Sequence, residues 1–144
     1  MAEQQLKELI SSLKNQGILT DYIDVVRSLQ DENNPHFLEN LIPDFFTSTE
    51  KKIAKLTSNL SEADVNYSSM VHLAYEIKGE ASYLACARLA NVSKELGDAS
   101  NAQNKDECLR LLDNVKSEYY YVKPHLNRIV KLERAIYENQ QAGK

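Results

Sequence analysis

Residues 68–84 read SSMVHLAYEIKGEASYL, and this stretch carries the clearest structural signal in the chain. Its apolar side chains recur every three or four positions, which is the period of an α-helix with one buried face. The apolar stripe consists of Met70, Ala74, Ile77, Ala81 and Leu84. The helical period places Lys78 on the flank of this stripe. The residues expected to point away from it are Tyr75, Gly79, Ser82 and Cys86.

The same periodicity predicts three helices before this stretch. Apolar residues between positions 6 and 13 form the first, and Gly17 is a typical residue to end it. Thr20 or Asp21 is suited to cap a short second helix. Asn34-Pro35 combines a capping residue with a first-turn proline and begins a long third helix. Pro43 lies within that helix, where we expect a bend and no break because the apolar spacing continues through it.

Two helices are predicted after the central stretch. One lies near residues 87–96 and ends at Gly97, and a long one covers residues 105–137 with a bend at Pro124. The long helix has the apolar spacing of a bundle helix at Leu109, Leu112, Val115, Tyr119, Val122, Leu126 and Ile129. We therefore predict an all-α protein: an antiparallel four-helix bundle with extra N-terminal helices, about six in total. Residues 1–137 are expected to form one domain, and residues 138–144 a frayed tail.

Composition argues against several classes of function. The net charge of −4 does not favour nucleic-acid binding. Cys86 and Cys108 are far apart and form no CxxC or zinc-ligand pattern, so we expect free thiols in a reducing compartment, no metal and no cofactor. No apolar run resembles a signal peptide or a membrane span. We expect a soluble intracellular monomer that does not bind membranes.

Gly79 is unusual because a glycine inside a helix costs about 1 kcal/mol relative to alanine. It is expected on the outer face, where a bare helix surface would let a partner approach Tyr75 one turn earlier. Lys78 beside it is suited to hold an anion. The alternatives are a tolerated glycine, or one that admits a neighbouring helix, and a simply solvated lysine.

These residues, with most of the chain, resemble the plant histidine-containing phosphotransfer proteins. Residues 29–37, LQDENNPHF, are similar to that family's Leu-Gln-Asp-x-x-Asn-Pro-x-Phe, and Phe45-Phe46 and Glu50 follow at the family's distance. Residues 116–120, KSEYY, resemble its Lys-x-Glu-Tyr-Tyr. The central family motif, His-Gln-x-Lys-Gly-Ser-Ser-x-Ser, is similar to residues 75–83, YEIKGEASY.

The resemblance implies a pseudo-phosphotransfer member that lacks the acceptor histidine. Lys78, Gly79 and Ser82 agree with the family, whereas Tyr75 stands at the acceptor position and Glu76 at that of the glutamine. Glu80, Ala81 and Tyr83 stand at serine positions. A phenol with a pKa near 10 is a poor nucleophile at neutral pH. Glu76 and Glu80 add negative charge where a phosphate would arrive.

We therefore expect a non-catalytic module that docks receiver domains of hybrid sensor histidine kinases and of response regulators. By occupying them it would inhibit the phosphorelay, in plants that of cytokinin signalling, in the cytoplasm and the nucleus. The second helix and the start of the third are expected to complete the docking face. The expected docking residues are Tyr75, Glu76, Lys78, Gly79, Glu80 and Ser82.

Two alternatives remain open. In the first, the protein is an active phosphocarrier that uses His72, which lies one helical turn before Tyr75 and about 60° round the helix. In the second, the module has drifted to a different partner, with Glu80 and Tyr83 changing its specificity. His36 and His125 are expected at the surface, the run Tyr119 to Tyr121 in packing, and Cys86 in no functional role.

Overall fold

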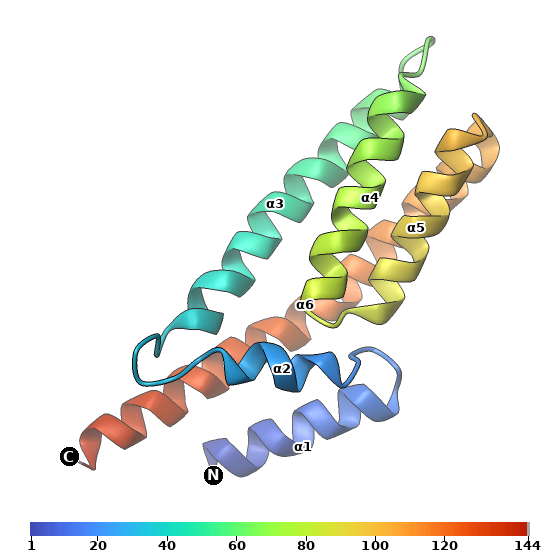
Figure 1. Ribbon diagram of the computed structural model, residues 1–144. Coiled ribbons are helices and arrows are strands. Elements are labelled where there is room, and N and C mark those ends of the chain that lie inside the picture. Colours follow the sequence, from blue (N-terminus) through green and yellow to red (C-terminus); the bar gives the residue numbers. More distant parts are fainter. Residues whose placement is uncertain (144) are drawn as a thin grey trace.

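A computed structural model describes residues 1–143 of the chain. Helices make up most of this part, as the sequence predicts, and α3 to α6 are arranged side by side as a bundle (Figure 1). In that bundle α3 packs on α4 and α6, and α5 packs on α4 and α6. The helices are α1 (Ala2–Asn15), α2 (Tyr22–Ser28), α3 (Phe37–Leu60), α4 (Tyr67–Tyr83), α5 (Ala87–Asn101) and α6 (Lys105–Ala142).

The two N-terminal helices lie at one end of the bundle. Figure 1 shows α1 beside the C-terminal part of α6, which extends beyond the other bundle helices. Arg27 of α2 forms an ion pair with Glu133 of α6 at 2.9 Å between Nε and Oε1. An antiparallel bridge between Leu19 and Cys86 joins the α1–α2 loop to the α4–α5 loop. These contacts place α2 next to the C-terminal end of α4.

The ends of α1 and α3 test the capping predictions. Gly17 has φ +72°, and the amides of Gly17 and Ile18 bond back to the carbonyls of Lys14 and Leu13, which confirms Gly17 as the residue that ends α1. The predicted start of α3 at Asn34-Pro35 is wrong, because the helix begins at Phe37. The Gln30 side chain accepts a bond from the amide of Leu38 at 3.0 Å, so a residue from the preceding turn supplies the cap.

Two further helix boundaries differ from prediction. α5 continues through Gly97 to Asn101, and it ends where Gln103 adopts φ +55°. Gly97 is therefore a buried residue in the middle of the helix. α6 continues past the predicted end at Tyr137 to Ala142, while the last residue of the predicted tail, Lys144, lies outside the described residues. The division into a domain of residues 1–137 and a tail stays a prediction. Pro43 and Pro124 lie inside continuous helices, and the bends predicted at them stay predictions.

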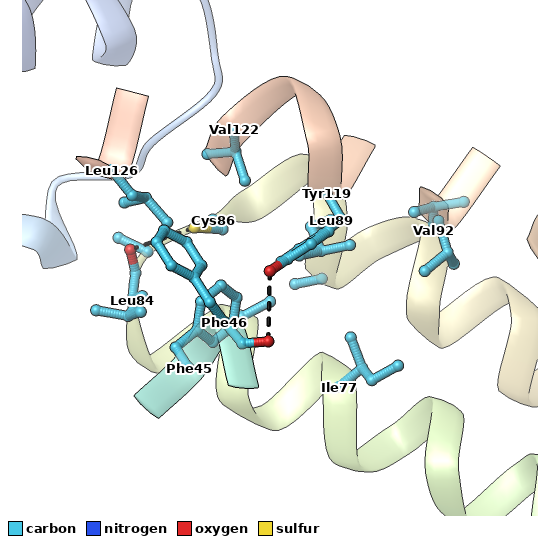
Figure 2. Close-up of a cluster of buried hydrophobic side chains, with 14 of the residues drawn as sticks. Phe45, Phe46, Ile77, Leu84, Cys86, Leu89, Val92, Tyr119, Val122 and Leu126 are labelled. Carbon is cyan, nitrogen blue, oxygen red and sulfur yellow. Dashed lines mark hydrogen bonds between the residues drawn. The ribbon is translucent and has the colours of Figure 1, made fainter. Parts of the chain in front are cut away.

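The core is centred on Tyr119 of α6, which is fully buried (Figure 2). Its ring packs against Phe45 and Phe46 of α3, each at 6.2 Å between centroids. Its hydroxyl points toward the Phe46 carbonyl at 3.4 Å and donates to Glu50 at 2.5 Å. Because the hydroxyl has a carboxylate partner, a polar group is accommodated inside an apolar core.

Two residues do not lie on the face that the sequence predicts. Leu109 is 46% exposed, because Cys108, Leu111 and Leu112 form the buried side of α6 at that level. Cys86 was expected on the outer side of α4 and is buried instead. α4 ends at Tyr83 and Ala85 adopts φ +63°, so the chain turns inward before Cys86 and the helical period no longer applies. Burial raises the pKa of the Cys86 thiol to about 12.

Thr49 of α3 offers a test of core packing. Its side chain is fully buried, and among the described residues its hydroxyl finds no hydrogen-bond partner. We expect Thr49→Val to stabilise the protein by about 1 kcal/mol, because valine keeps the shape and removes the unsatisfied hydroxyl. Urea unfolding measures this change. The control is Thr47→Val, since the exposed Thr47 hydroxyl donates to the Pro43 carbonyl. An equal gain in both variants would contradict the explanation.

Candidate functional site

The outer side of α4 carries the residues that the sequence singles out. The Asn66 side chain caps this helix by accepting a bond from the Ser69 amide at 3.1 Å. Met70, Ala74, Ile77 and Ala81 are buried, which confirms the predicted stripe. The opposite side exposes most of the expected docking residues. They are Tyr75, Glu76, Lys78, Gly79 and Ser82, with Glu80 half-buried at the edge toward α3.

Tyr75 lies against α5, although it is 39% exposed. Its hydroxyl donates to Asp98 Oδ1 at 2.5 Å, and Lys94 Nζ donates to Asp98 Oδ2 at 2.9 Å. The hydrogen bond to Asp98 and partial desolvation raise the pKa of Tyr75 above its ordinary value. The same bond and Lys94 lower the pKa of Asp98. The phenol is therefore neutral at physiological pH and directed toward a neighbouring helix.

The Tyr75 ring lies directly over Gly97 of α5. A Cβ atom built on Gly97 would lie 2.4 Å from Cε1 of that ring, a distance that real Cβ atoms do not show. The sequence placed Gly97 at the end of a helix, and so missed its role in admitting an aromatic ring. The signal that could have indicated this role is that Gly97 lies within a periodic apolar run, because such glycines also occur where another group approaches the backbone closely. Nothing in the sequence pointed to Lys94 or Asp98.

The two carboxylates that flank Tyr75 on the other side have a partner from α3. Lys52, whose side chain is 18% exposed, forms an ion pair with Glu80 and lies 4.0 Å from Glu76. Glu76 also lies 3.3 Å from Nε2 of His72. Lys52 thus offsets part of the negative charge that the sequence predicts for this face. Sequence reasoning missed this lysine because it is far from Glu80 in the chain and belongs to another helix.

Gly79 borders an open hollow between α3 and α4. A Cβ atom at Gly79 would meet nothing within 4 Å, so the alternative that this glycine admits a neighbouring helix is wrong. The hollow has a volume of about 410 Å³. It is lined by Leu41, Asp44, Phe45, Ser48, Gly79, Glu80, Tyr83 and Leu84. A bare helix surface beside this mainly apolar hollow leaves room for the side chains of a partner.

Helix α2 extends this surface. Tyr22, Val25 and Leu29 are exposed and follow the spacing of one helix face. The Tyr22 ring meets the Tyr83 ring edge-on, at 6.4 Å between centroids. The predicted contribution of the second helix therefore has a structural basis, since its apolar side adjoins the C-terminal end of α4.

Other candidate residues lie apart from this surface or at its edge. His72 is on α4, with a side chain that is 75% exposed. His36 is exposed and packs on Tyr137 at 4.7 Å between ring centroids, and His125 is half-buried beside Tyr121. Among residues 1–143, no group of three potential ligands is arranged to hold a metal. None of the helices in that range has the length and apolarity of a transmembrane span.

Comparison with known proteins decides the family. No protein-family model matches the sequence. Histidine-containing phosphotransfer protein 1 of Arabidopsis thaliana is 30% identical over 134 residues, which cover 93% of this chain and 87% of that protein. The chain belongs to the plant histidine-containing phosphotransfer family. The family includes pseudo members: pseudo histidine-containing phosphotransfer protein 6 of Arabidopsis thaliana is 29% identical over 92% of this chain and 86% of its own length.

Solved structures agree with this assignment. The histidine-containing phosphotransfer protein MtHPt2 of Medicago truncatula is 27% identical and superposes with a TM-score of 0.86, over 99% of this chain and 95% of its own. The histidine-containing phosphotransfer protein ZmHP2 of maize superposes with a TM-score of 0.87 at 20% identity, over 94% of this chain and 99% of its own. The histidine phosphotransfer fold thus extends over the whole bundle and both N-terminal helices.

Proposed function

We propose that this histidine phosphotransfer homologue is a non-catalytic member that docks receiver domains without accepting phosphate. Its partners would be receiver domains of hybrid sensor histidine kinases and of response regulators. By occupying them it would act as a negative regulator of the phosphorelay, in cytokinin signalling, in the cytoplasm and the nucleus. The observation that carries the proposal is the open helix surface at Gly79 close to a phenol at position 75.

The chemistry of Tyr75 supports the loss of transfer. We infer from the motif in residues 75–83 that Tyr75 stands where active members carry the acceptor histidine. Attack on an aspartyl phosphate needs a lone pair on a nucleophilic atom, and a neutral phenol without a base is a weak nucleophile. Asp98 accepts the hydrogen bond of the phenol, but its own pKa is lowered and it raises the pKa of Tyr75, so transfer of the proton to give the phenolate is disfavoured. A tyrosine phosphate ester, if it formed, would be too stable to return its group to a carboxylate.

The geometry around Gly79 supports the retention of docking. Position 79 exposes bare helix, Lys78 beside it is exposed, and the adjacent hollow is mainly apolar. The exposed side of α2 adds Tyr22, Val25 and Leu29. Aromatic and aliphatic groups around a recess are typical of the centre of a protein interface. Lys52 reduces the repulsion that Glu76 and Glu80 would exert on an acidic partner.

His72 provides the second candidate function, an active phosphocarrier. Its favourable feature is accessibility, since the side chain is 75% exposed. Its Nε2 atom lies 3.3 Å from Glu76, so a phosphoryl group on that atom would meet a carboxylate. This arrangement favours the docking function over the phosphocarrier.

A paired assay with one phosphorylated receiver domain tests the proposal. We expect the wild-type protein to bind the receiver in a calorimetric titration and to acquire no stable label from the phosphorylated receiver. Label on the wild type that disappears in His72→Ala would establish the phosphocarrier instead. Absence of binding to receivers would favour the remaining alternative, in which the module has drifted to a different partner. His125→Ala is the matched control for loss of a histidine.

A further inference from the structure

We propose that Gly97 and Asp98 of α5 are positioning residues that hold Tyr75 down on α5, and that Asp98 is a second barrier to phosphotransfer, independent of the phenol. The second half of this inference rests on the proposed function. It implies that a histidine at position 75 does not by itself make an acceptor, because the carboxylate of Asp98 faces that position.

Gly97 and Tyr75 fit each other sterically. Three ring carbons of Tyr75 lie within 2.8 Å of the place where a Cβ atom on Gly97 would be. Any larger residue at position 97 therefore has to displace the ring. Glycine is otherwise a poor choice in a helix interior because it has the largest backbone entropy to lose. A buried glycine on α5 is thus explained by the aromatic ring from α4 that covers it.

Asp98 holds the other end of the ring. One carboxylate oxygen accepts the Tyr75 hydroxyl at 2.5 Å and the other accepts Lys94 at 2.9 Å. The charged groups acting on this pair are Lys94 on α5 and Lys78 on α4. Steric contact at Gly97 and hydrogen bonding at Asp98 together hold the phenol against α5, whereas the hollow at Gly79 lies between α3 and α4.

The same carboxylate would oppose an imidazole at position 75. In transfer, a nitrogen lone pair forms the N–P bond while the aspartyl O–P bond breaks and the receiver's aspartate leaves as a carboxylate. The charge of a neighbouring Asp98 would stabilise the imidazolium, so a smaller fraction of the imidazole would carry the free lone pair that attack requires. It would also repel the phosphoryl group after transfer. Asp98→Asn removes the charge and frees Lys94 to approach the phosphate.

Phosphotransfer in a set of variants tests the role of Asp98. The probe is a receiver domain of a hybrid histidine kinase loaded with labelled phosphate, and the readout is the initial rate of labelling. We expect Tyr75→His to remain near the wild-type background and Tyr75→His/Asp98→Asn to be labelled at least tenfold faster, which corresponds to about 1.4 kcal/mol of activation free energy. The control is Tyr75→His/Asp113→Asn, because Asp113 is an exposed carboxylate on α6. Equal rates in Tyr75→His and the Asp98 double variant would overturn the second barrier, provided that the receiver binds.

Two further measurements need no receiver, so they separate this inference from the proposed function. The first is the ionisation of Tyr75, followed by carbon NMR of labelled tyrosine and assigned with Tyr75→Phe. We expect Asp98→Asn to lower the pKa of Tyr75 toward its ordinary value, and Asp113→Asn to leave it unchanged. A Tyr75 pKa that is the same in wild type and Asp98→Asn would show that Asp98 does not hold the phenol.

The second measurement is a double-mutant cycle between positions 75 and 97, read as melting temperatures. Gly97→Ala is expected to lower the melting temperature in the wild type, because the new methyl group collides with the ring. In the Tyr75→Ala background the same change is expected to raise it, because alanine is the better helix former. A shift of the same sign and size in both backgrounds would refute the steric dependence of Gly97 on Tyr75.

Discussion

Gly79→Gln is expected to weaken binding to a receiver domain at least tenfold, which corresponds to about 1.4 kcal/mol, and to leave the fold intact. The reason is steric. A Cβ atom at position 79 meets nothing in the free protein, so the glutamine side chain projects into the space beside the hollow that a partner would enter. The helix itself should gain several tenths of a kcal/mol, because glutamine has a much better helix propensity than glycine.

The two effects have opposite signs, which makes this test sharp. Calorimetric titration with one receiver domain measures the affinity, and urea unfolding measures the free energy of unfolding. Ser117→Gln is the matched control, because Ser117 is an exposed position on α6, outside the Gly79 surface. If Gly79→Gln binds a receiver as tightly as the wild type does, the docking face lies elsewhere on the molecule.

Tyr119→Ala is expected to destabilise the protein by roughly 3–5 kcal/mol, as is usual when a fully buried aromatic ring is removed. Its ring packs against both Phe45 and Phe46, so the substitution leaves a cavity in the buried cluster of the bundle (Figure 2). It also leaves Glu50 with Lys123 as its remaining partner, at 2.7 Å. Urea unfolding at neutral pH measures the loss.

Two companion variants separate packing from hydrogen bonding. Tyr119→Phe keeps the ring and removes the hydroxyl that Glu50 accepts, and its expected cost is about 1–2 kcal/mol. Tyr121→Ala removes an exposed tyrosine two positions later on α6, whose ring centroid lies 5.2 Å from Cζ of Arg88. We expect it to lower the free energy of unfolding by less than about 1 kcal/mol. Equal losses in Tyr119→Ala and Tyr121→Ala would contradict the central position of Tyr119 in the core.

Most of the fold could be predicted because its signals are local. The apolar period identified every helix, and Gly17 marked a real helix end because the turn there needs a positive φ. The errors arose where a distant group replaced a local one. Gln30 caps α3 in place of Asn34, and Gly97 lies under a ring from α4 where the sequence suggested a helix end. Neither contact follows a sequence period.

The candidate site shows the same division. Tyr75, Lys78 and Gly79 share the outer side of α4 because their spacing within one helix requires it. The partners of these residues come from other helices. Lys52 reaches Glu80 from α3, and Asp98 reaches Tyr75 from α5. The charge predicted for this face was therefore too negative, and the predicted outward position of Tyr75 did not include its contact with α5.

The sequence alone determined that the chain is helical, that the side of α4 with Tyr75 and Gly79 faces outward, and which family it resembles. These properties follow from the helical period and from residues close together in the chain. The tertiary structure alone decided which way the Tyr75 ring lies, which charges are neutralised, and that Gly79 is open while Gly97 is covered. Those outcomes depend on the packing of α3 and α5 against α4, and distances between helices are not encoded in the spacing of residues within one helix.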